Sequence, residues 1–266
     1  MADLVSPGIL IKETDLTTTV PPVGGSSAGI VIAAEWGPAE EAITVTSETD
    51  LVEVFGKPPT GVTENWLVAA NYLSYASNLQ VARSLDGSAS GTYTDYNASD
   101  GAVVTVKNTS HFNDLTFSAH SFIARYPGAK GNEIGVGIIT KGGTTSSASI
   151  KLNKAGVIVA TGEEITLNYG AEFDYAPDTT DYVAARGGAA DEIHVVVFDK
   201  RGSITGVQGS ILEKFQGLSL ANDAKDSFGA SNYIKDVLYN QSKWVYFTGD
   251  WTSLIGDTDA TNWDGG

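Results

Sequence analysis

The chain has 266 residues, enough for one large domain or two modest ones with a real hydrophobic core. Apolar residues make up 42% of the chain, and its 30 glycines together with many Thr, Ser and Val favour strands and turns over helix bundles. With 16 basic against 32 acidic residues, the net charge of −16 repels phosphate backbones and anionic lipids, which argues against nucleic acid and membrane as partners.

The acidic charge has two explanations: solubility of a subunit made in large amounts, or an acidic face matched to a basic patch on another subunit. The absence of cysteine excludes disulfides, thiolate metal sites and cysteine nucleophiles. The first residues lack the basic start and apolar core of a secretion signal, and the apolar run 29–34 is too short to cross a bilayer. These features are consistent with synthesis in the cytoplasm.

The first 25 residues are predicted to form an arm. Pro7 makes a turn, residues 8–14 then extend as a strand, and the pairs Pro21-Pro22 and Gly24-Gly25 interrupt the β-like pattern. A strand so close to a terminus, cut off by these breakers, is free to pair outside its own domain. The alternative is an ordinary edge strand of the same chain.

Residues 26–85 have the pattern of an α/β unit. The apolar run 28–34 predicts a strand covered on both faces, and residues 43–45 predict a second, short strand. Residues 79–84 resume strand-like alternation after two predicted helices. Strand, helix, helix, strand is a crossover unit.

Two helices are predicted inside this unit. Ser47 is a candidate N-cap, Asp50 three residues later resembles a capping box, and Gly56 stops this short helix. The second helix covers residues 65–77. Its apolar stripe consists of Trp66, Ala69, Ala70 and Leu73.

The rest of the chain is predicted as a short β-rich insertion, residues 86–124, and a further folded part, residues 125–247. Strands are expected at residues 102–106, 115–117, 134–139, 150–152, 156–159, 164–167, 192–198 and 244–247, and a helix at residues 232–240. After the strand 192–198, residues 199–202 turn and residues 203–206 follow as the return limb of a hairpin, whereas residues 211–215 are ambiguous. Residues 248–266 predict an acidic irregular tail or the start of a further domain. The fold class is therefore mixed, α+β or α/β, and rich in β-structure.

Candidate catalytic residues are few. His194 lies in a predicted strand two residues after Glu192, on the same face, which permits a general base oriented by a carboxylate. The simpler interpretation is a cross-strand polar contact within a sheet. His111 and His120 lie too far apart for a helical metal pair and have no ligand-like neighbours.

Two other patterns suggest ligands but lack the required context. The glycines of residues 24–29 precede a β-like run, whereas a phosphate loop follows a strand and opens a helix. The cluster of Asp257, Asp259, Asn262 and Asp264 misses the spacing of a helix-loop-helix calcium site and is better explained as a solvated tail. We therefore expect no catalytic residue, no cofactor and no metal.

A set of short segments, in this order along the chain, resembles the tail sheath proteins of contractile-tailed bacteriophages of the myovirus type. The segments are Ser6-Pro7-Gly8-Ile9 with Lys12-Glu13, Trp36-Gly37-Pro38, Phe55-Gly56, Tyr72-Leu73, Leu79-Gln80-Val81-Ala82-Arg83, Arg125-Tyr126-Pro127-Gly128 with Gly131-Asn132, Glu192-Ile193-His194-Val195-Val196-Val197, Leu212-Glu213 with Phe215, and Asn232-Tyr233 through Lys243. Each segment is a weak signal alone, and the ordered set over most of the chain is fairly specific.

The resemblance implies a structural subunit rather than an enzyme. Such a subunit forms a β-rich sheath-type body with crossover helices, stacks in six-fold helical rings around the tail tube, and contracts to drive the tube through the bacterial envelope. Its partners would be other copies of itself, the tail tube protein, and baseplate and tail terminator proteins. It would be made in the host bacterial cytoplasm and reside in the virion tail.

The resemblance also implies that terminal arms add strands to sheets of neighbouring subunits. The donated strand would consist of Gly8, Ile9, Leu10, Ile11, Lys12, Glu13 and Thr14, and the arm hinge of Pro21, Pro22, Gly24 and Gly25. Two departures from the family pattern stand out. The inserted region looks reduced, and family members usually extend well past residue 266.

Three alternatives remain open at this stage. A carbohydrate-binding adhesin would use Trp36, Trp66, Trp251 and Trp263 as stacking platforms. A hydrolase acting on the cell envelope would use His194 and Glu192. The sheath of a phage-derived secretion or bacteriocin machine cannot be separated from a virion sheath by sequence.

Overall fold

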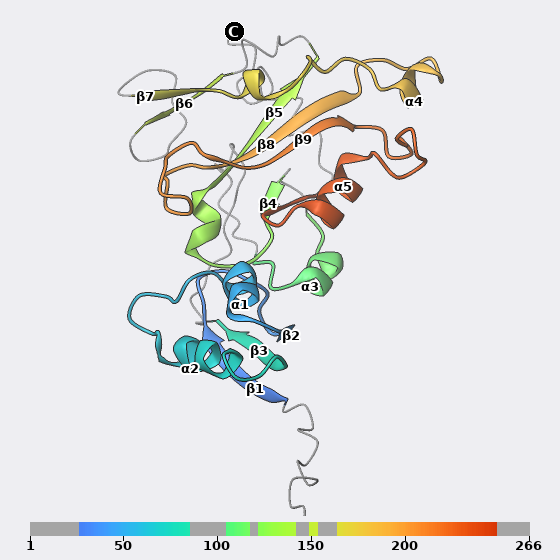
Figure 1. Ribbon diagram of the computed structural model, residues 1–266. Coiled ribbons are helices and arrows are strands. Elements are labelled where there is room, and N and C mark those ends of the chain that lie inside the picture. Colours follow the sequence, from blue (N-terminus) through green and yellow to red (C-terminus); the bar gives the residue numbers. More distant parts are fainter. Residues whose placement is uncertain (1–26, 86–104, 118–121, 142–148, 154–163, 249–266) are drawn as a thin grey trace, which may run out of the picture.

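The computed structural model describes residues 27–85, 105–117, 122–141, 149–153 and 164–248 (Figure 1). The chain is a mixed α+β protein, as predicted. Figure 1 shows a smaller N-terminal unit, residues 27–85, below a larger part, which we call the body and which comprises the described residues between 105 and 248. No helix among the described residues is long and apolar enough to cross a membrane.

The N-terminal unit is a three-stranded sheet with two helices on one face. Its elements are β1 (Ala28–Ala33), β2 (Ala42–Val45), α1 (Glu48–Phe55), α2 (Glu64–Leu73) and β3 (Leu79–Ser84). The strand order is β1-β3-β2, with β1 parallel and β2 antiparallel to β3. Because β1 and β3 are parallel, the chain between them must cross over, and α1 and α2 lie in that connection. The predicted crossover unit is confirmed.

The first helix begins where the sequence predicts. The Ser47 side chain accepts a hydrogen bond from the Asp50 backbone N–H at 3.1 Å, which satisfies one of the free donors of the first turn. The Asp50 carboxylate accepts from the Thr46 N–H at 3.0 Å, one residue before the position that a capping box uses. The second helix ends at Leu73, earlier than the predicted residue 77.

The prediction that the first strand is covered on both faces is wrong for the described chain. Ile32 is fully buried against the helices, whereas Val31 on the opposite face is 56% exposed. Strand β1 is also an edge strand, because it pairs only with β3 among the described residues. The face that Val31 shares carries Gly29 and Ala33 as its other residues, so Val31 is the one large apolar side chain of β1 on that face, and the small ones lose little in contact with water.

The body is built around an antiparallel sheet of order β5-β8-β9. Its elements are α3 (Thr109–Asp114), β4 (Phe122–Ala124), the short 3₁₀-helix η1 (Ala129–Glu133), β5 (Ile134–Thr140), β6 (Ser149–Asn153), β7 (Glu164–Asn168), η2 (Tyr169–Glu172), α4 (Asp181–Ala184), β8 (Glu192–Asp199), β9 (Ile211–Ser219), α5 (Ile234–Gln241) and β10 (Val245–Phe247). Strand β10 pairs with β4, and β6 pairs with β7, both antiparallel.

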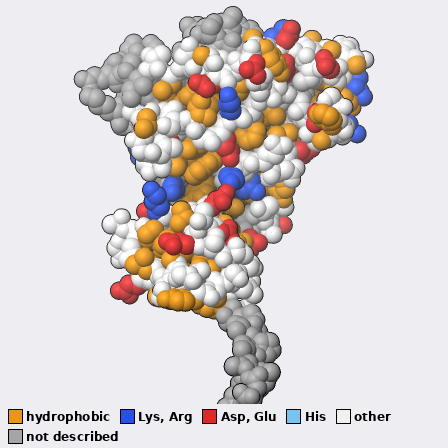
Figure 2. Space-filling model, in the orientation of Figure 1, with side chains coloured by type: hydrophobic (Ala, Val, Ile, Leu, Met, Phe, Trp, Pro, Cys, Tyr) orange, Lys and Arg blue, Asp and Glu red, His pale blue; other side chains and the backbone are white. Residues whose placement is uncertain are grey.

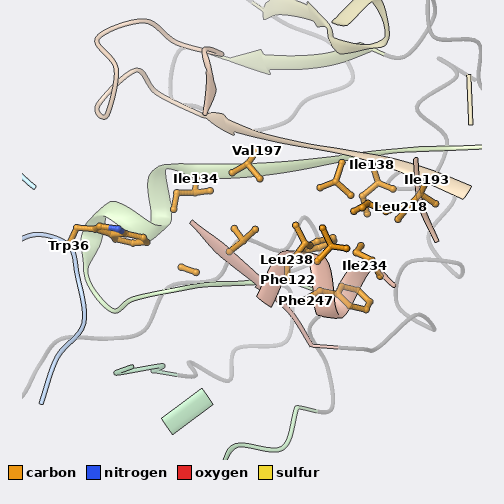
Figure 3. Close-up of a cluster of buried hydrophobic side chains, with 14 residues drawn as sticks. Trp36, Phe122, Ile134, Ile138, Ile193, Val197, Leu218, Ile234, Leu238 and Phe247 are labelled. Atoms are coloured by element: carbon orange, nitrogen blue, oxygen red, sulfur yellow. The ribbon is translucent and has the colours of Figure 1, made fainter. Parts of the chain in front are cut away.

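Strand β8 is the centre of the body, and every one of its residues is buried. Ile193, Val195 and Val197 face the main core, which is closed on the other side by α5, β4 and β10 (Figure 3). Val196 and Phe198 face a second cluster with Tyr169 and Phe173. A strand covered on both faces needs apolar side chains or polar ones that are fully hydrogen-bonded. The five apolar residues of β8 explain its strong strand pattern, and its buried Glu192, His194 and Asp199 all have hydrogen-bond partners.

The return limb of the β8 hairpin was predicted in the wrong place. Residues 203–206 lie in a turn-rich loop, and the strand that pairs with β8 is β9, which begins at Ile211. The Asp199 carboxylate organises this loop by accepting hydrogen bonds from the N–H groups of Gly202, Ile204 and Thr205, each at 2.8 Å. The loop is therefore an ordered structure that replaces a tight hairpin turn.

The segment before the sheet also differs from the prediction. Residues 115–117 pair with no strand among the described residues; they follow helix α3, whose N-cap Asn108 accepts from the His111 N–H at 2.9 Å. Phe112 of this helix stacks on Tyr246 of β10 with the ring centroids 4.0 Å apart. The described end of the predicted insertion thus packs on the body, and β4 belongs to a body sheet.

The predicted strands 150–152 and 164–167 are confirmed as β6 and β7, and 244–247 and 232–240 correspond to β10 and α5. The predicted strand 156–159 lies outside the described residues, as do most of residues 102–106 and of the acidic tail 248–266.

Candidate functional site

Trp36 connects the N-terminal unit to the body. It follows β1 in the sequence, yet its side chain is 5% exposed and belongs to the core cluster of the body (Figure 3). The ring lies 5.4 Å from that of Tyr126 in an edge-on arrangement and 5.2 Å from that of Trp244. The core of the N-terminal unit is a separate cluster, so Trp36 is an anchor of one unit inside the other. We call the contact between the two units the joint.

Three glycines of the joint adopt backbone conformations that favour glycine, and two of them, Gly37 and Gly128, also allow the backbones to approach closely. Gly37, Gly56 and Gly128 have φ of 101°, 80° and 129°, in the region that favours glycine. A Cβ on Gly37 would lie 2.7 Å from the Val54 carbonyl oxygen, and one on Gly128 would lie 2.9 Å from the Glu35 carbonyl oxygen. Side chains at these positions would force the segments apart.

Arg83, the penultimate residue of β3, points into the joint from the helix-covered face of its sheet. Its Nε donates to the Ala34 carbonyl and its Nη1 to the Gly37 carbonyl, both at 2.8 Å. The residue is 5% exposed, and burial lowers the pKa of its guanidinium to about 10. These bonds fix the chain that leads from β1 to Trp36.

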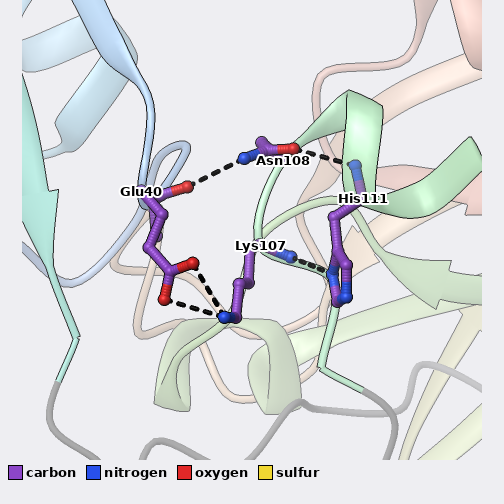
Figure 4. A network of polar contacts seen from close by, with 5 residues as sticks. Glu40, Lys107, Asn108 and His111 are labelled. Atoms are coloured by element: carbon purple, nitrogen blue, oxygen red, sulfur yellow. Dashed lines mark hydrogen bonds and ion pairs between the residues drawn. The ribbon is translucent and has the colours of Figure 1, made fainter. Parts of the chain in front are cut away.

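A polar network closes another side of the joint (Figure 4). The Lys107 ammonium group lies 2.8 Å from the Glu40 carboxylate, and the Asn108 side-chain amide donates to the Ala39 carbonyl at 3.0 Å. The Asn108 oxygen also caps α3, and the His111 Nδ1 accepts from the Lys107 N–H at 3.3 Å. One short segment of the body thus holds both its own helix and the N-terminal unit.

The joint brings together segments that lie far apart in the sequence. Trp36-Gly37-Pro38, Phe55-Gly56, Arg83 and Tyr126-Pro127-Gly128 all belong to the segments that carry the resemblance to sheath proteins. Locally, Gly56 ends a predicted helix and Arg83 lies in a predicted strand, which gives no sign that these segments meet. Their common role, fixing two units against each other, becomes visible only in three dimensions.

His194 does not have the geometry of a general base. Its ring is fully buried; Nδ1 accepts from the Gly217 N–H at 3.0 Å, so Nε2 carries the proton and donates to the Tyr175 carbonyl at 2.8 Å. Glu192 instead accepts from the Tyr175 hydroxyl at 2.6 Å and the Asp178 N–H at 3.0 Å. The simpler interpretation, a structural contact between strands, fits this geometry.

The tryptophans that an adhesin would use are not surface platforms where they are described. Trp36 and Trp66 are 5% and 3% exposed, so neither ring face is free for a sugar. Trp251 and Trp263 lie outside the described residues.

The remaining candidate sites fall mostly on residues that the structure does not describe. The inter-subunit strand of residues 8–14, the hinge at Pro21, Pro22, Gly24 and Gly25, His120 and the acidic residues after 256 all lie there. Among the described residues, no group of three or more His, Asp or Glu side chains is arranged to hold a metal ion.

Comparison with known proteins points to one family. No protein-family model matches the chain. The tail sheath protein of Salmonella phage ViI is 25% identical over a match that covers 91% of this chain and 49% of that protein. The chain is similar to phage tail sheath proteins. The tail sheath proteins of Enterobacteria phage T4 and Vibrio phage KVP40 are 39% and 38% identical over 31% and 36% of this chain.

These relatives confirm the resemblance that the ordered segments indicate. The chain spans about half the length of the ViI tail sheath protein, and its matches cover 13% and 14% of the T4 and KVP40 tail sheath proteins.

Proposed function

We propose that this chain is a structural subunit of a contractile tail sheath, which assembles in helical rings around a tail tube and contracts to drive the tube through a bacterial envelope. The observation that carries the proposal is the match to a tail sheath protein over 91% of the chain. The joint supports it, because the resembling segments build a mechanical connection between two units rather than a reactive site.

The proposed core sheath domain comprises residues 26–85 and 125–247, with residues 86–124 as a reduced insertion whose described end packs on residues 125–247. The match to the ViI protein spans 311 aligned positions, more than the 266 residues of this chain, so that relative carries additional residues within the matched region. We propose that part of this difference lies in the shortened insertion. Residues 248–266 would be an acidic tail or lead into a further domain.

Assembly would use the N-terminal arm. Residues 8–14 would add a strand to a sheet of a neighbouring copy, with Pro21, Pro22, Gly24 and Gly25 as the hinge. Other copies, the tail tube protein, and baseplate and terminator proteins would be its partners, and the virion tail its location, after synthesis in the host cytoplasm.

The arm is tested by the double substitution Ile9→Asp with Ile11→Asp. Pairing would remove the two new carboxylates on one face of the donated strand from water, which costs free energy, so ordered sheath should be lost. The circular dichroism spectrum of the separated subunit should stay unchanged. The matched control is Thr17→Asp with Thr19→Asp, on the same arm outside the strand. Normal sheath from the Ile9/Ile11 variant would refute the arm assignment.

The function itself is tested by immunogold electron microscopy of native particles with an antibody raised against this chain. We expect gold at regular intervals along a striated tail. Gold confined to fibres, to the baseplate or to free protein would contradict the proposal.

A further inference from the structure

A hollow of about 480 Å³ opens at the joint between the N-terminal unit and the body. Its charged and polar wall consists of Glu35, Arg83, Ser84, Lys130, Glu133 and Ser203, together with Gly128. Figure 2 shows Lys and Arg side chains along the narrowing between the two units. Two cationic and two acidic side chains therefore line this concave surface of a chain whose net charge is −16.

Arg83 is a buried cation that has no carboxylate partner among the described residues. Within the described part of the chain, two of its five N–H groups donate to carbonyl oxygens, and it forms no ion pair. Its remaining donors include those of Nη2, which lies beside Gly128 at the wall of the hollow. A buried charge is normally paired, because burial alone penalises the charged form.

Lys130 is the second cation at the hollow, and the Glu35 and Asp199 carboxylates lie close enough to favour its charged form. Its ammonium group makes no hydrogen bond or ion pair to the described residues, and partial burial lowers its pKa. Glu133 is engaged with Arg201 at 2.7 Å, and its second oxygen is buried without a hydrogen-bond partner in the described chain. Glu35 is exposed at the rim.

We propose that the hollow is a docking site for one carboxylate side chain of a second copy of this chain. The spare donors of Arg83 and the Lys130 ammonium group would bind its two oxygens. Glu133 is paired with Arg201, so Glu35 offsets one of the two cations, and the balance of one positive charge at the wall matches a single carboxylate. This inference rests on the proposed self-assembling function.

Charge complementarity argues that the docked carboxylate comes from a second copy of this chain. The chain has 32 acidic side chains against 16 basic ones, so its surface offers many carboxylates to a neighbour. Copies packed in rings would repel each other unless some acidic groups met cationic ones. A neutralised Arg83 would also tighten the joint, because the same guanidinium holds Ala34 and Gly37.

The hollow is tested first without assembly, by thermal unfolding of the chain in sodium acetate and in sodium chloride at equal ionic strength. Ser203 is exposed at the hollow, so Ser203→Asp supplies a carboxylate in cis and Ser203→Asn is its uncharged control. We expect acetate to raise Tm of the wild type and of Ser203→Asn by about 3 °C, and to leave Ser203→Asp unchanged. Equal Tm in both salts for all three proteins would overturn the proposal.

Assembly then identifies the source of the carboxylate. In native particles that carry the variants, Ser203→Asp should reduce the fraction of tails with sheath about tenfold relative to Ser203→Asn, because the hollow is already filled. If acetate raises Tm of the wild type but Ser203→Asp still forms sheath normally, the hollow is a site for small anions only. That outcome would overturn the proposed docking by a second copy. Absence of this protein from sheaths of wild-type particles would instead refute the proposed function, and the acetate result would still stand.

Asp86 follows the hollow-lining Leu85 in the sequence, and a variant checks whether the chain supplies its own carboxylate. If a second copy is the source, Asp86→Asn should respond to acetate like the wild type. A larger acetate response of Asp86→Asn would show that Asp86 occupies the hollow and would contradict the proposal.

Discussion

Trp36→Ala should weaken the joint so that the N-terminal unit and the body no longer unfold together. The substitution removes a ring that is 5% exposed and lies against Tyr126 and Trp244. Truncation of a buried Trp to Ala costs about 3–5 kcal/mol, a large part of the ~5–15 kcal/mol that stabilises a typical domain. The core around Leu51, Phe55 and Trp66 does not contain Trp36 and should stay intact.

The assay is urea unfolding followed by far-ultraviolet circular dichroism, with hydrogen exchange to resolve the two units. We expect the wild type to unfold in one cooperative transition. In Trp36→Ala, protection should fall first for amides at the joint, and the transitions of the N-terminal unit and the body should no longer coincide.

Two control variants show whether the effect is specific to the loss of the Trp36 ring. Tyr75 in the N-terminal unit is 88% exposed, so Tyr75→Ala should change stability by less than about 0.5 kcal/mol. Trp36→Phe keeps part of the ring packing and should fall between Trp36→Ala and the wild type. A Trp36→Ala protein that loses less than about 1 kcal/mol and still unfolds in one transition would refute the anchoring role.

Three further predictions concern the joint and the body. Gly37→Ala should lower the free energy of unfolding in urea by more than about 3 kcal/mol, because the new Cβ would meet the Val54 carbonyl oxygen at 2.7 Å. The control Gly61→Ala, at φ of 89° with open space around it, should cost only about 1–2 kcal/mol. Equal losses for the two variants would contradict the close approach at Gly37. His194→Leu should destabilise the fold by about 2–4 kcal/mol, since it leaves the Gly217 N–H and the Tyr175 carbonyl unpaired, and a neutral effect would refute the structural role. Burial raises the pKa of the Glu213 carboxyl above its ordinary value of 4.5, so the folded chain binds the carboxyl proton more tightly than the unfolded chain. The contribution of Glu213 to the free energy of unfolding should therefore fall as pH rises from about 4.5 through the folded pKa. A stability difference between wild type and Glu213→Gln that is independent of pH would contradict this reasoning.

Local sequence signals predicted the N-terminal unit well. Ser47 caps its helix as expected, and the crossover between β1 and β3 follows from the order of the apolar segments. Coverage of β1 was predicted wrongly because an apolar run does not reveal how much of its surface comes from small side chains. Val31 lies on the uncovered face of β1 and is 56% exposed, which the apolar pattern alone does not predict.

The partner of β8 was missed for a different reason. Strand β9 pairs with β8 through register shifts near Val195 and Phe198, and such irregularities break the alternation of apolar and polar residues. The loop before β9 is organised by the buried Asp199, and one acidic residue gives no such signal in the sequence. Helix α3 escaped notice because it has only six residues.

The joint was beyond sequence reasoning because its contacts join distant segments. Trp36 meets Trp244, and Arg83 meets the carbonyl of Gly37, without any local pattern that links them. The ordered segments that resemble sheath proteins were the available signal, since several of them meet at the joint. A resemblance can therefore mark important residues before their physical role is known.

Helical reconstruction of the striated tail by cryo-electron microscopy tests the central claim most directly. If this chain is a sheath subunit, the described residues should fit the repeating sheath density as one rigid body, with Trp36 seated between Tyr126 and Trp244 in every copy. Sheath density that accommodates neither the N-terminal unit nor the body would contradict the account.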